Sequence, residues 1–330
     1  MTPSRRSLLR LAPLPVLSLG LAACGTTDPA RSTTEAGSAS DAGGAIDLTD
    51  GSGKTVSLTA PAKAVVALEW NSVEDVLTTG GTLVGASDPK GYAQWGSETV
   101  TIPKKVTDVG LRTEPSVETI AGLEPDLILG ITESIPEGAL GKMKKIAPVL
   151  LLSGADASRP IELMRKNHLT TGRAVGHEDT AQKNLDDFDD AVSEAKKTLA
   201  PTADAPVVFL YPFVDGGQVS FRIHGKRSLP GAVAGLCGLT NAWTKPGDDG
   251  WGLDTADLEQ LTELPEKTRI LYWEDPTSDP IHDTLADNAV WKRIPAVQRG
   301  DVHGVGLRTW IYGGPQAMIR LIGDFVDALA

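Results

Sequence analysis

The sequence predicts two Rossmann-like α/β lobes joined by a single long helix. Short apolar runs separated by Gly and Pro alternate with helical stretches, which is typical of parallel sheets. The strand patterns at 65–68 and 127–129 recur at 207–210 and 269–271 with the same spacing, as expected for two similar lobes. A helical segment without proline, 161–199, lies between the two copies. Chance similarity of short strand patterns is the alternative explanation of the repeat.

Residues 1–23 are predicted to be an export signal. Arginines precede an apolar stretch that is shorter than the roughly 20 residues of a membrane-spanning helix. The run Leu21-Ala22-Ala23-Cys24 resembles a bacterial lipobox, so we expect Cys24 to be lipidated and to anchor the protein at the outer face of the cell membrane. The pair Arg5-Arg6 also fits a twin-arginine signal, and the choice between that route and general secretion stays open.

The N-terminal lobe is expected at residues 46–158, after a tether. Residues 24–45 contain almost nothing to bury, which favours a flexible tether. Within the lobe, buried-strand patterns at 65–68, 83–86 and 127–129 alternate with helical stretches. One of these helices begins after Ser116, a residue type that favours helix N-caps.

The helical segment 159–200 is predicted to connect the lobes, and residues 201–330 are predicted to form the second lobe. Its second half shows apolar residues at helical steps of three and four, namely Ala181, Leu185, Phe188, Val192, Ala195 and Leu199. A helix over 178–199 is roughly 33 Å long, enough to bridge two small domains. The acidic run at 186–190 is interpreted as its solvated face.

Composition and charge exclude several classes of function. The chain has 330 residues, of which 41% are hydrophobic, and its net charge of −12 disfavours nucleic acid as a partner. It has two cysteines, and no two of its five histidines stand at metal-ligand spacing, so we expect no metal site or cofactor. Cys237 lies in an apolar stretch that indicates a buried thiol, and the histidines are expected on the surface or at helix ends. Phosphate-loop, nucleophile-elbow and zinc-helix motifs are missing, and we therefore predict a binding protein rather than an enzyme.

The tryptophans indicate a ligand site. The chain has seven tryptophans and only four tyrosines. Four of the tryptophans lie in stretches with loop composition: Trp95, Trp243, Trp251 and Trp310. A loop tryptophan beside polar residues offers an apolar wall to a ligand, whereas packing in the core is the alternative for each of them.

Several strings resemble the solute-binding proteins of bacterial iron-siderophore importers, most closely the hydroxamate-siderophore binders. They are Val65-Val66-Ala67-Leu68-Glu69-Trp70, Asp108-Val109-Gly110-Leu111-Arg112-Thr113-Glu114-Pro115, Asn241-Ala242-Trp243 and Trp310-Ile311-Tyr312-Gly313. This resemblance implies a class III periplasmic binding protein of the helical-backbone type, a monomer with its ligand cleft between the lobes. It also implies capture of a pre-formed Fe(III)-siderophore chelate and its delivery to an ABC-transporter permease with a cytoplasmic ATPase.

The resemblance assigns Arg112 to the iron-bound hydroxamate oxygens, with a surface or interlobe ion pair to a residue such as Glu114 as the alternative. The family pattern has a tyrosine in the stretch matched by 131–135, where this chain offers only Ser134 or Thr132 as a substitute. Arg222 is an extra positive group that would suit a more anionic ligand. The other residues placed at the ligand by this resemblance are Trp70, Trp95, Asn241, Trp243, Trp310 and Tyr312.

The resemblance further implies one acidic docking residue for the permease on each lobe, and Glu137 and Glu259 are the positions expected here. A catecholate siderophore, haem or a corrinoid stays open as the ligand of the same architecture. Haem would favour an axial ligand such as Tyr92 or Tyr312. An extracytoplasmic α/β enzyme is a distant alternative, because no nucleophile and base pair is evident.

Overall fold

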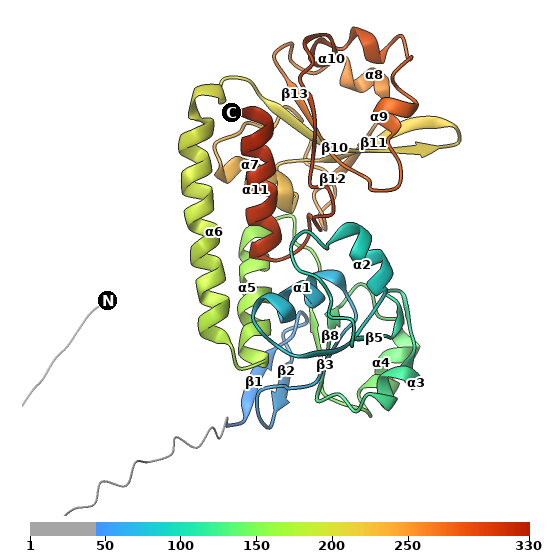
Figure 1. Ribbon diagram of the computed structural model, residues 1–330, viewed down its shortest axis with the longest axis vertical. Helices are drawn as coiled ribbons and strands as arrows, with labels where there is room; N and C mark the ends of the chain where they lie inside the picture. The colour runs from blue at the N-terminus through green and yellow to red at the C-terminus, as the bar shows by residue number, and fades with distance from the viewer. Residues whose placement is uncertain (1–43) are drawn as a thin grey trace, which may run out of the picture. The chain divides into compact units, whose positions relative to one another are not determined.

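The computed structural model describes residues 44–330 (Figure 1). The predicted signal, the lipidated Cys24 and all but the last two residues of the tether lie outside the described residues. Within 44–330, no helix is both long and apolar enough to cross a membrane.

The first lobe is built on a parallel sheet of five strands in the order β5-β4-β3-β8-β9. Its central pair joins Val65 of β3 to Leu127 of β8, as the buried-strand patterns predict. The strands are β1 (Ile46–Thr49) and β2 (Thr55–Leu58), which form a separate hairpin, β3 (Val65–Ala67), β4 (Leu83–Ala86), β5 (Thr107–Asp108), the short hairpin β6 (Gly110–Leu111) and β7 (Glu114–Pro115), β8 (Leu127–Ile131) and β9 (Val149–Leu152). The helices are α1 (Trp70–Thr78), α2 (Pro89–Trp95), α3 (Val117–Gly122) and α4 (Glu137–Met143).

The second lobe is built on a mixed sheet in the order β12-β11-β10-β13-β14. The strands are β10 (Val207–Asp215), β11 (Gln218–His224), β12 (Leu253–Ala256), β13 (Arg269–Trp273) and β14 (Val302–Val305). The helices are α7 (Leu229–Leu236), α8 (Leu258–Leu261), α9 (Pro280–Asp283) and α10 (Pro295–Arg299), with 3₁₀ turns η1 (Ala200–Thr202) and η2 (Trp291–Arg293).

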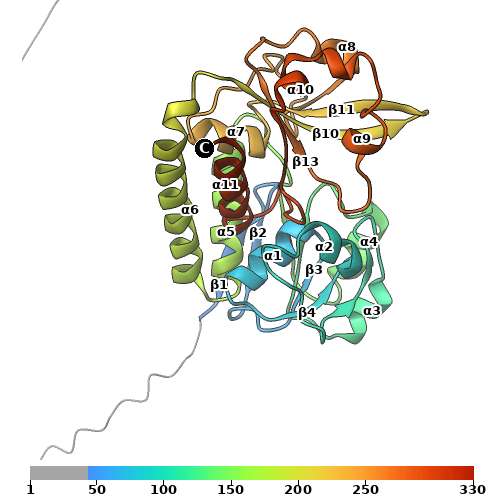
Figure 2. The same cartoon turned by 45° about the horizontal axis from the view of Figure 1, so that its top comes forward.

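The predicted repeat is present in the central strand pairs but not beyond them. Val207 of β10 pairs in parallel with Arg269 of β13, as Val65 pairs with Leu127 in the first lobe. In the first lobe a helix then leads to the parallel strand β4, whereas β10 turns back directly into the antiparallel strand β11. Gly216 and Gly217 make this turn with φ of 56° and 82°, which glycine adopts without steric cost. Figure 2 shows the resulting long hairpin.

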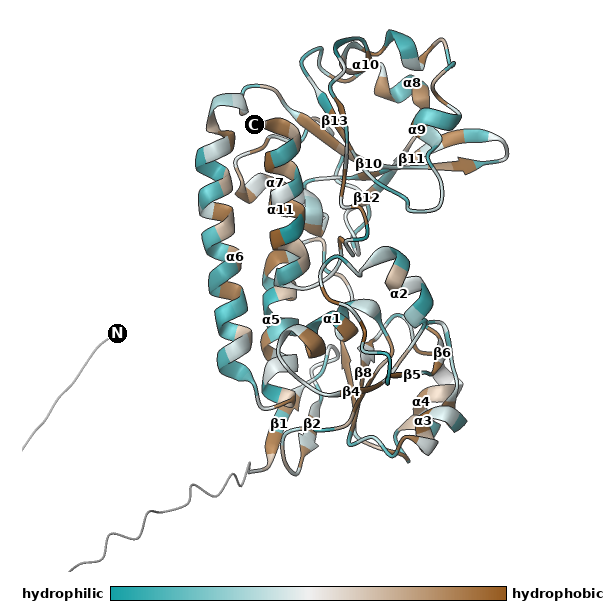
Figure 3. Cartoon of the chain, viewed as in Figure 1, coloured by the Kyte–Doolittle hydropathy of each residue, from teal (hydrophilic) through white to brown (hydrophobic). Residues whose placement is uncertain are grey.

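Three helices connect the lobes and cover them on one side. They are α5 (Pro160–Ala174), α6 (Glu178–Leu199) and the C-terminal α11 (Pro315–Leu329), and α6 packs against both others (Figure 1). The predicted long helix has the expected bounds, and the apolar stripe on α6 is buried except for the half-buried Val192. The acidic run at 186–190 faces solvent apart from Phe188, and Figure 3 shows this division of hydropathy along α6.

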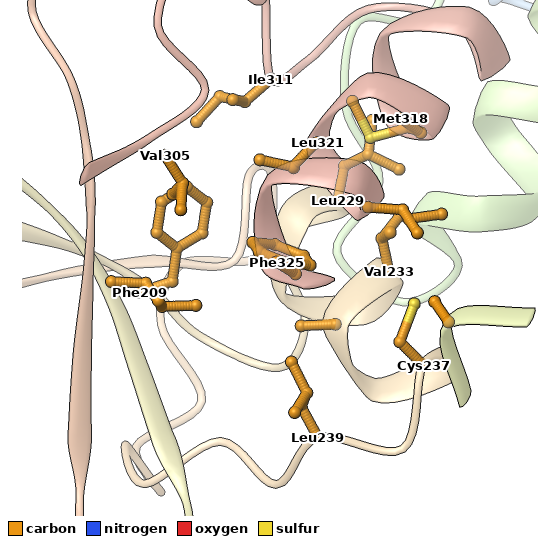
Figure 4. Packing of buried hydrophobic residues seen from close by; sticks show 14 of the residues in the cluster. Phe209, Leu229, Val233, Cys237, Leu239, Val305, Ile311, Met318, Leu321 and Phe325 are labelled. Atoms are coloured by element: carbon orange, nitrogen blue, oxygen red, sulfur yellow. The ribbon is translucent and has the colours of Figure 1, made fainter. Parts of the chain in front are cut away.

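The largest core joins the second lobe to these helices. Phe209 of β10 and Phe325 of α11 meet edge to face with ring centroids 6.0 Å apart (Figure 4). Cys237 is part of this core, as predicted, and burial raises the pKa of its thiol to about 12. Trp95 and Trp310 pack against both this core and the core of the first lobe, so apolar contacts continue from one lobe to the other.

Candidate functional site

A cleft of about 360 Å³ lies between the lobes. It opens at the carboxyl ends of β3 and β8, the edge of a parallel sheet where ligands usually bind. Residues of both lobes line it: Glu69, Asn71, Arg112 and Ile131 from the first lobe, and Arg222, Trp251, Leu253, Trp310 and Tyr312 from the second.

Arg112 is held in this cleft by a carboxylate and an aromatic ring. Its Nη1 donates to Oε1 of Glu69 over 2.6 Å, and its guanidinium carbon lies 3.9 Å from the centroid of the Trp70 ring. The Arg112 side chain is 31% exposed and that of Glu69 only 8%, so the remaining N–H groups of the guanidinium have access to solvent. Arg112 therefore presents hydrogen-bond donors whose positive charge Glu69 already compensates.

The local backbone explains how these groups meet. Glu69 follows strand β3 after one residue, Leu68, and caps helix α1, where its Oε1 also accepts from the backbone N–H of Trp70 at 2.9 Å. Arg112 lies in the turn between β6 and β7, two residues after Gly110, which has φ of 99°. A Cβ at Gly110 would lie 2.8 Å from the carbonyl oxygen of Glu114, so this turn requires glycine.

Aromatic rings form a continuous wall from one lobe to the other. Trp70 and Trp310 meet edge to face with centroids 4.9 Å apart, and Trp251 meets Tyr312 in the same way at 4.9 Å. Trp310 and Tyr312 are 6.1 Å apart and complete the row. Such a wall suits a bulky ligand with apolar linkers.

The loop that carries Trp251 is organised by Asp248. Its carboxylate accepts from the backbone N–H groups of Gly250, Trp251 and Leu253. Burial alone would raise the pKa of Asp248, but these N–H groups hold it below its ordinary value. Gly252 has φ of 69° and no room for a Cβ, so the loop conformation is fixed on both sides of Trp251.

Two histidines are buried, contrary to the prediction that all lie at the surface or at helix ends. His224 is bonded through Nδ1 to the Tyr312 hydroxyl at 2.9 Å, and burial, together with the charge of Arg222, lowers its pKa to about 3. His168 on α5 is hydrogen-bonded through Nδ1 to the Asp75 carboxylate on α1, at 2.6 Å. Each histidine completes a polar contact between elements, which outweighs its tendency to face water. No group of three potential ligands that could hold a metal ion occurs within 44–330.

The structure brings together five of the residues predicted at the ligand. Arg112, Arg222, Trp310 and Tyr312 line the cleft, and the ring of Trp70 packs against the guanidinium of Arg112. Trp95 lies deeper, between Tyr211 and Trp273 at the junction of the lobes. Ser134 turns back toward the Ile131 carbonyl, at 3.4 Å, and is not a cleft residue.

Trp243 and Asn241 are placed elsewhere. Trp243 is 5% exposed in the core of the second lobe, and its indole N–H donates to Asp254 at 3.0 Å. Asn241 accepts from the backbone N–H of Trp243 and donates to the carbonyl of His224. Packing and hydrogen bonding within the lobe therefore account for both residues, and neither lines the cleft.

The two residues expected at a permease lie on different lobes. Glu259 is exposed on α8, whose first turn is fixed by a capping box between Asp257 and Gln260. Glu137 is the first residue of α4, and its side chain lies outside what the structure describes. Their docking role stays a prediction.

Residues missed from the sequence supply the rest of the cleft. Glu69 and Ile131 lie where strands end. Ligands of parallel sheets usually bind at the carboxyl ends of the strands, and this rule could have identified both residues from the sequence. Trp251 is one of the four loop tryptophans that the sequence offered as an apolar wall, but it was not among the residues that the resemblance placed at the ligand. Asn71 and Leu253 have no signal of their own, because only the approach of the two lobes places them at one surface.

Comparisons with known proteins match the chain both by sequence and by fold. A family model described as periplasmic binding protein matches residues 65–306. The iron(3+)-hydroxamate-binding protein FhuD of Escherichia coli strain K12 is 25% identical over 265 residues, which cover 80% of this chain and 86% of that protein. The Fe(3+)-citrate-binding protein YfmC of Bacillus subtilis strain 168 is 28% identical over 261 residues, 79% and 78% of the two chains. The crystal structure of the Fe³⁺-Desferal-bound siderophore-binding protein FhuD from Vibrio cholerae matches with a TM-score of 0.72 and 29% identity over 81% of this chain and 97% of that one.

Proposed function

Because the chain belongs to the periplasmic binding protein family, we propose that it captures an Fe(III)-siderophore complex outside the cytoplasm and delivers it to an ABC-type importer. It is a binding protein rather than an enzyme, in line with its relatives, which are named as binding proteins. The observation that carries the proposal is the half-exposed guanidinium of Arg112 in an aromatic cleft between two α/β lobes.

Hydroxamate siderophores are the ligand class that we propose. Three hydroxamates neutralise Fe(III), so the chelate presents clustered, partly negative oxygens without net charge. A guanidinium that is compensated by Glu69 offers hydrogen bonds to such oxygens without adding excess positive charge. The Desferal-bound structure and the E. coli hydroxamate binder support this choice among the relatives.

Haem is disfavoured as the ligand by the tyrosines. Tyr92 is 1% exposed, and the Tyr312 hydroxyl is bonded to His224. Neither presents a free oxygen to an iron in the cleft, which an axial ligand must do.

Delivery requires a membrane partner. We propose that Glu259 of the second lobe and Glu137 of the first contact the permease and that Cys24 carries the lipid anchor. Rim charges of this kind alter association rate and salt dependence more than folding. Exchanging Glu259 for glutamine should therefore slow iron uptake in cells while ligand binding stays unchanged.

Intrinsic tryptophan fluorescence of the soluble chain from residue 25 onward tests the ligand class. The aromatic wall next to the cleft makes quenching by a bound ferric complex the expected signal. Saturable quenching near or below about 1 μM by ferrioxamine or ferrichrome supports the proposal. Quenching only by a ferric catecholate, haemin, ferric citrate or cobalamin would retain the family and overturn the hydroxamate ligand.

A further inference from the structure

Arg222 lines the cleft from the second lobe. It stands on β11 between Phe221 and Ile223, both fully buried in the core on the other face of the sheet. Because side chains alternate along a strand, Arg222 is directed away from that core, and it is exposed beside Trp251 and Leu253.

Arg222 is the cleft cation that has no carboxylate to compensate it. Arg112 is paired with Glu69, whereas Arg222 has no carboxylate within ion-pair distance among the side chains described in 44–330. The charge of Arg222 acts on the hydroxyls of Tyr211 and Tyr312 and on the imidazole of His224. Two carboxylates act on the same hydroxyls without pairing with Arg222: Asp275 accepts from Tyr211 at 2.9 Å, and the charge of Asp248 reaches Tyr312. Its guanidinium carbon lies 5.9 Å from the ring centroid of Phe213.

The neighbouring cations on the same lobe are engaged or placed elsewhere. Arg227 pairs with Asp249 at 2.9 Å and donates to the carbonyl of Ala157 at 3.2 Å. Its guanidinium therefore links two segments of the protein and is already engaged. Lys226 is exposed and does not line the cleft. The cleft wall thus carries one net positive charge, in a chain whose net charge is −12.

We propose that the ligand is an Fe(III) chelate bearing one carboxylate that does not coordinate iron, and that Arg222 receives this carboxylate while Arg112 contacts the iron-bound oxygens. This inference rests on the proposed function and narrows its substrate class. A guanidinium forms paired hydrogen bonds with a carboxylate, and Glu69, the acidic side chain among the described cleft residues, is already paired with Arg112. The single free charge matches a monoanionic complex, and a chelate with several negative charges would leave most of them unpaired beside Glu69.

A charge series on one iron core tests the inference. Fe(III)-desferrioxamine B carries a free ammonium, its N-acetyl derivative is neutral at that end, and its N-succinyl derivative ends in a carboxylate. All three keep the same trihydroxamate core, so differences in Kd report the pendant group alone. We expect the succinyl form to bind roughly three- to fivefold more tightly than the acetyl form at low salt, as for an exposed ion pair, with the ammonium form weakest.

Arg222→Gln should abolish the advantage of the succinyl form, so that the succinyl and acetyl forms bind this variant with Kd values in a ratio of about one. Lys226→Gln is the matched control, because it removes the same charge from the same lobe outside the cleft and should retain the full series. Equal binding of the three chelates by the wild type, or a series that persists in Arg222→Gln, overturns the inference and spares the proposed function. Failure of all three chelates to bind overturns the hydroxamate function itself and, with it, the inference.

Discussion

Replacing Arg112 with glutamine should weaken the binding of a ferric trihydroxamate strongly. The guanidinium has five N–H groups, and the only one with a protein partner in the described residues bonds to Glu69. Hydrogen bonds to charged groups contribute about 1.5–3 kcal/mol, so losing this donor should raise Kd roughly ten- to a hundredfold. The variant also leaves Glu69, which is only 8% exposed, without its partner at 2.6 Å. This uncompensated carboxylate faces the ligand oxygens and adds repulsion to the loss.

The contribution of the donor is separated from that of the carboxylate by two further variants. Arg112→Gln/Glu69→Gln removes both charges and should recover part of the lost affinity, leaving about tenfold weaker binding than the wild type. Glu69→Gln alone keeps an oxygen that can accept from the backbone N–H of Trp70, so helix α1 retains its cap. It also frees the Nη1 group of Arg112 and should bind the neutral chelate at least as tightly as the wild type.

Fluorescence titration gives Kd for each variant, and thermal unfolding shows whether each one is folded. The reasoning is refuted if Arg112→Gln is folded and binds the chelate within twofold of the wild type. Arg112 would then serve only to stabilise the lobe through Glu69 and the Trp70 ring, a contact worth about 0.5–1 kcal/mol at a partly exposed site.

Three more predictions concern stability. Burial, and then the charge of Asp75, raise the pKa of Glu74 from 4.5 to about 8. The protonated carboxyl therefore adds to the free energy of unfolding, fully so below pH 4.5, and this stabilisation is lost as pH rises through 8, by up to about 1.4 kcal/mol per pH unit. Denaturant unfolding between pH 5 and 8 should show this slope in the wild type and lack it in Glu74→Gln. Phe209→Ala should lower the free energy of unfolding by about 3–5 kcal/mol in urea titrations, since its ring is buried against Phe325. Trp243→Phe loses the bond to Asp254 and should destabilise by about 1 kcal/mol. Its Kd for the ferric trihydroxamate should stay within twofold, and a larger change would return Trp243 to the site.

The central strand pairs and the long helix could be predicted because their signals are local and repeated. Val65–Ala67 and Val207–Leu210 read as buried strands wherever they lie, and the stripe on α6 follows from helical periodicity alone. The antiparallel course of β11 was not evident, because it depends on a two-glycine turn that also fits a longer loop.

The candidate site was predictable only in part. Arg112, Trp310 and Tyr312 stand in recognisable strings and do line the cleft, whereas Trp243 stands in an equally distinctive string and lies in the core. Tryptophan serves as a core residue and as a ligand wall with the same local sequence, so burial decides between the two roles. The buried histidines show the same limit, because His224 faces Tyr312 from a segment far away in the chain.

The sequence by itself determined that this chain forms two α/β lobes with a bridging helix and carries an arginine in a loop typical of siderophore binders. Those properties depend on periodicity, composition and short motifs, which neighbouring residues define. Only the tertiary structure decided that Glu69 compensates Arg112 and that Trp251 rather than Trp243 completes the aromatic wall. It also decided that Arg222 has no ion-pair partner among the side chains that the structure describes. Charge compensation and burial depend on distances between residues far apart in the chain, and packing of the two lobes sets those distances.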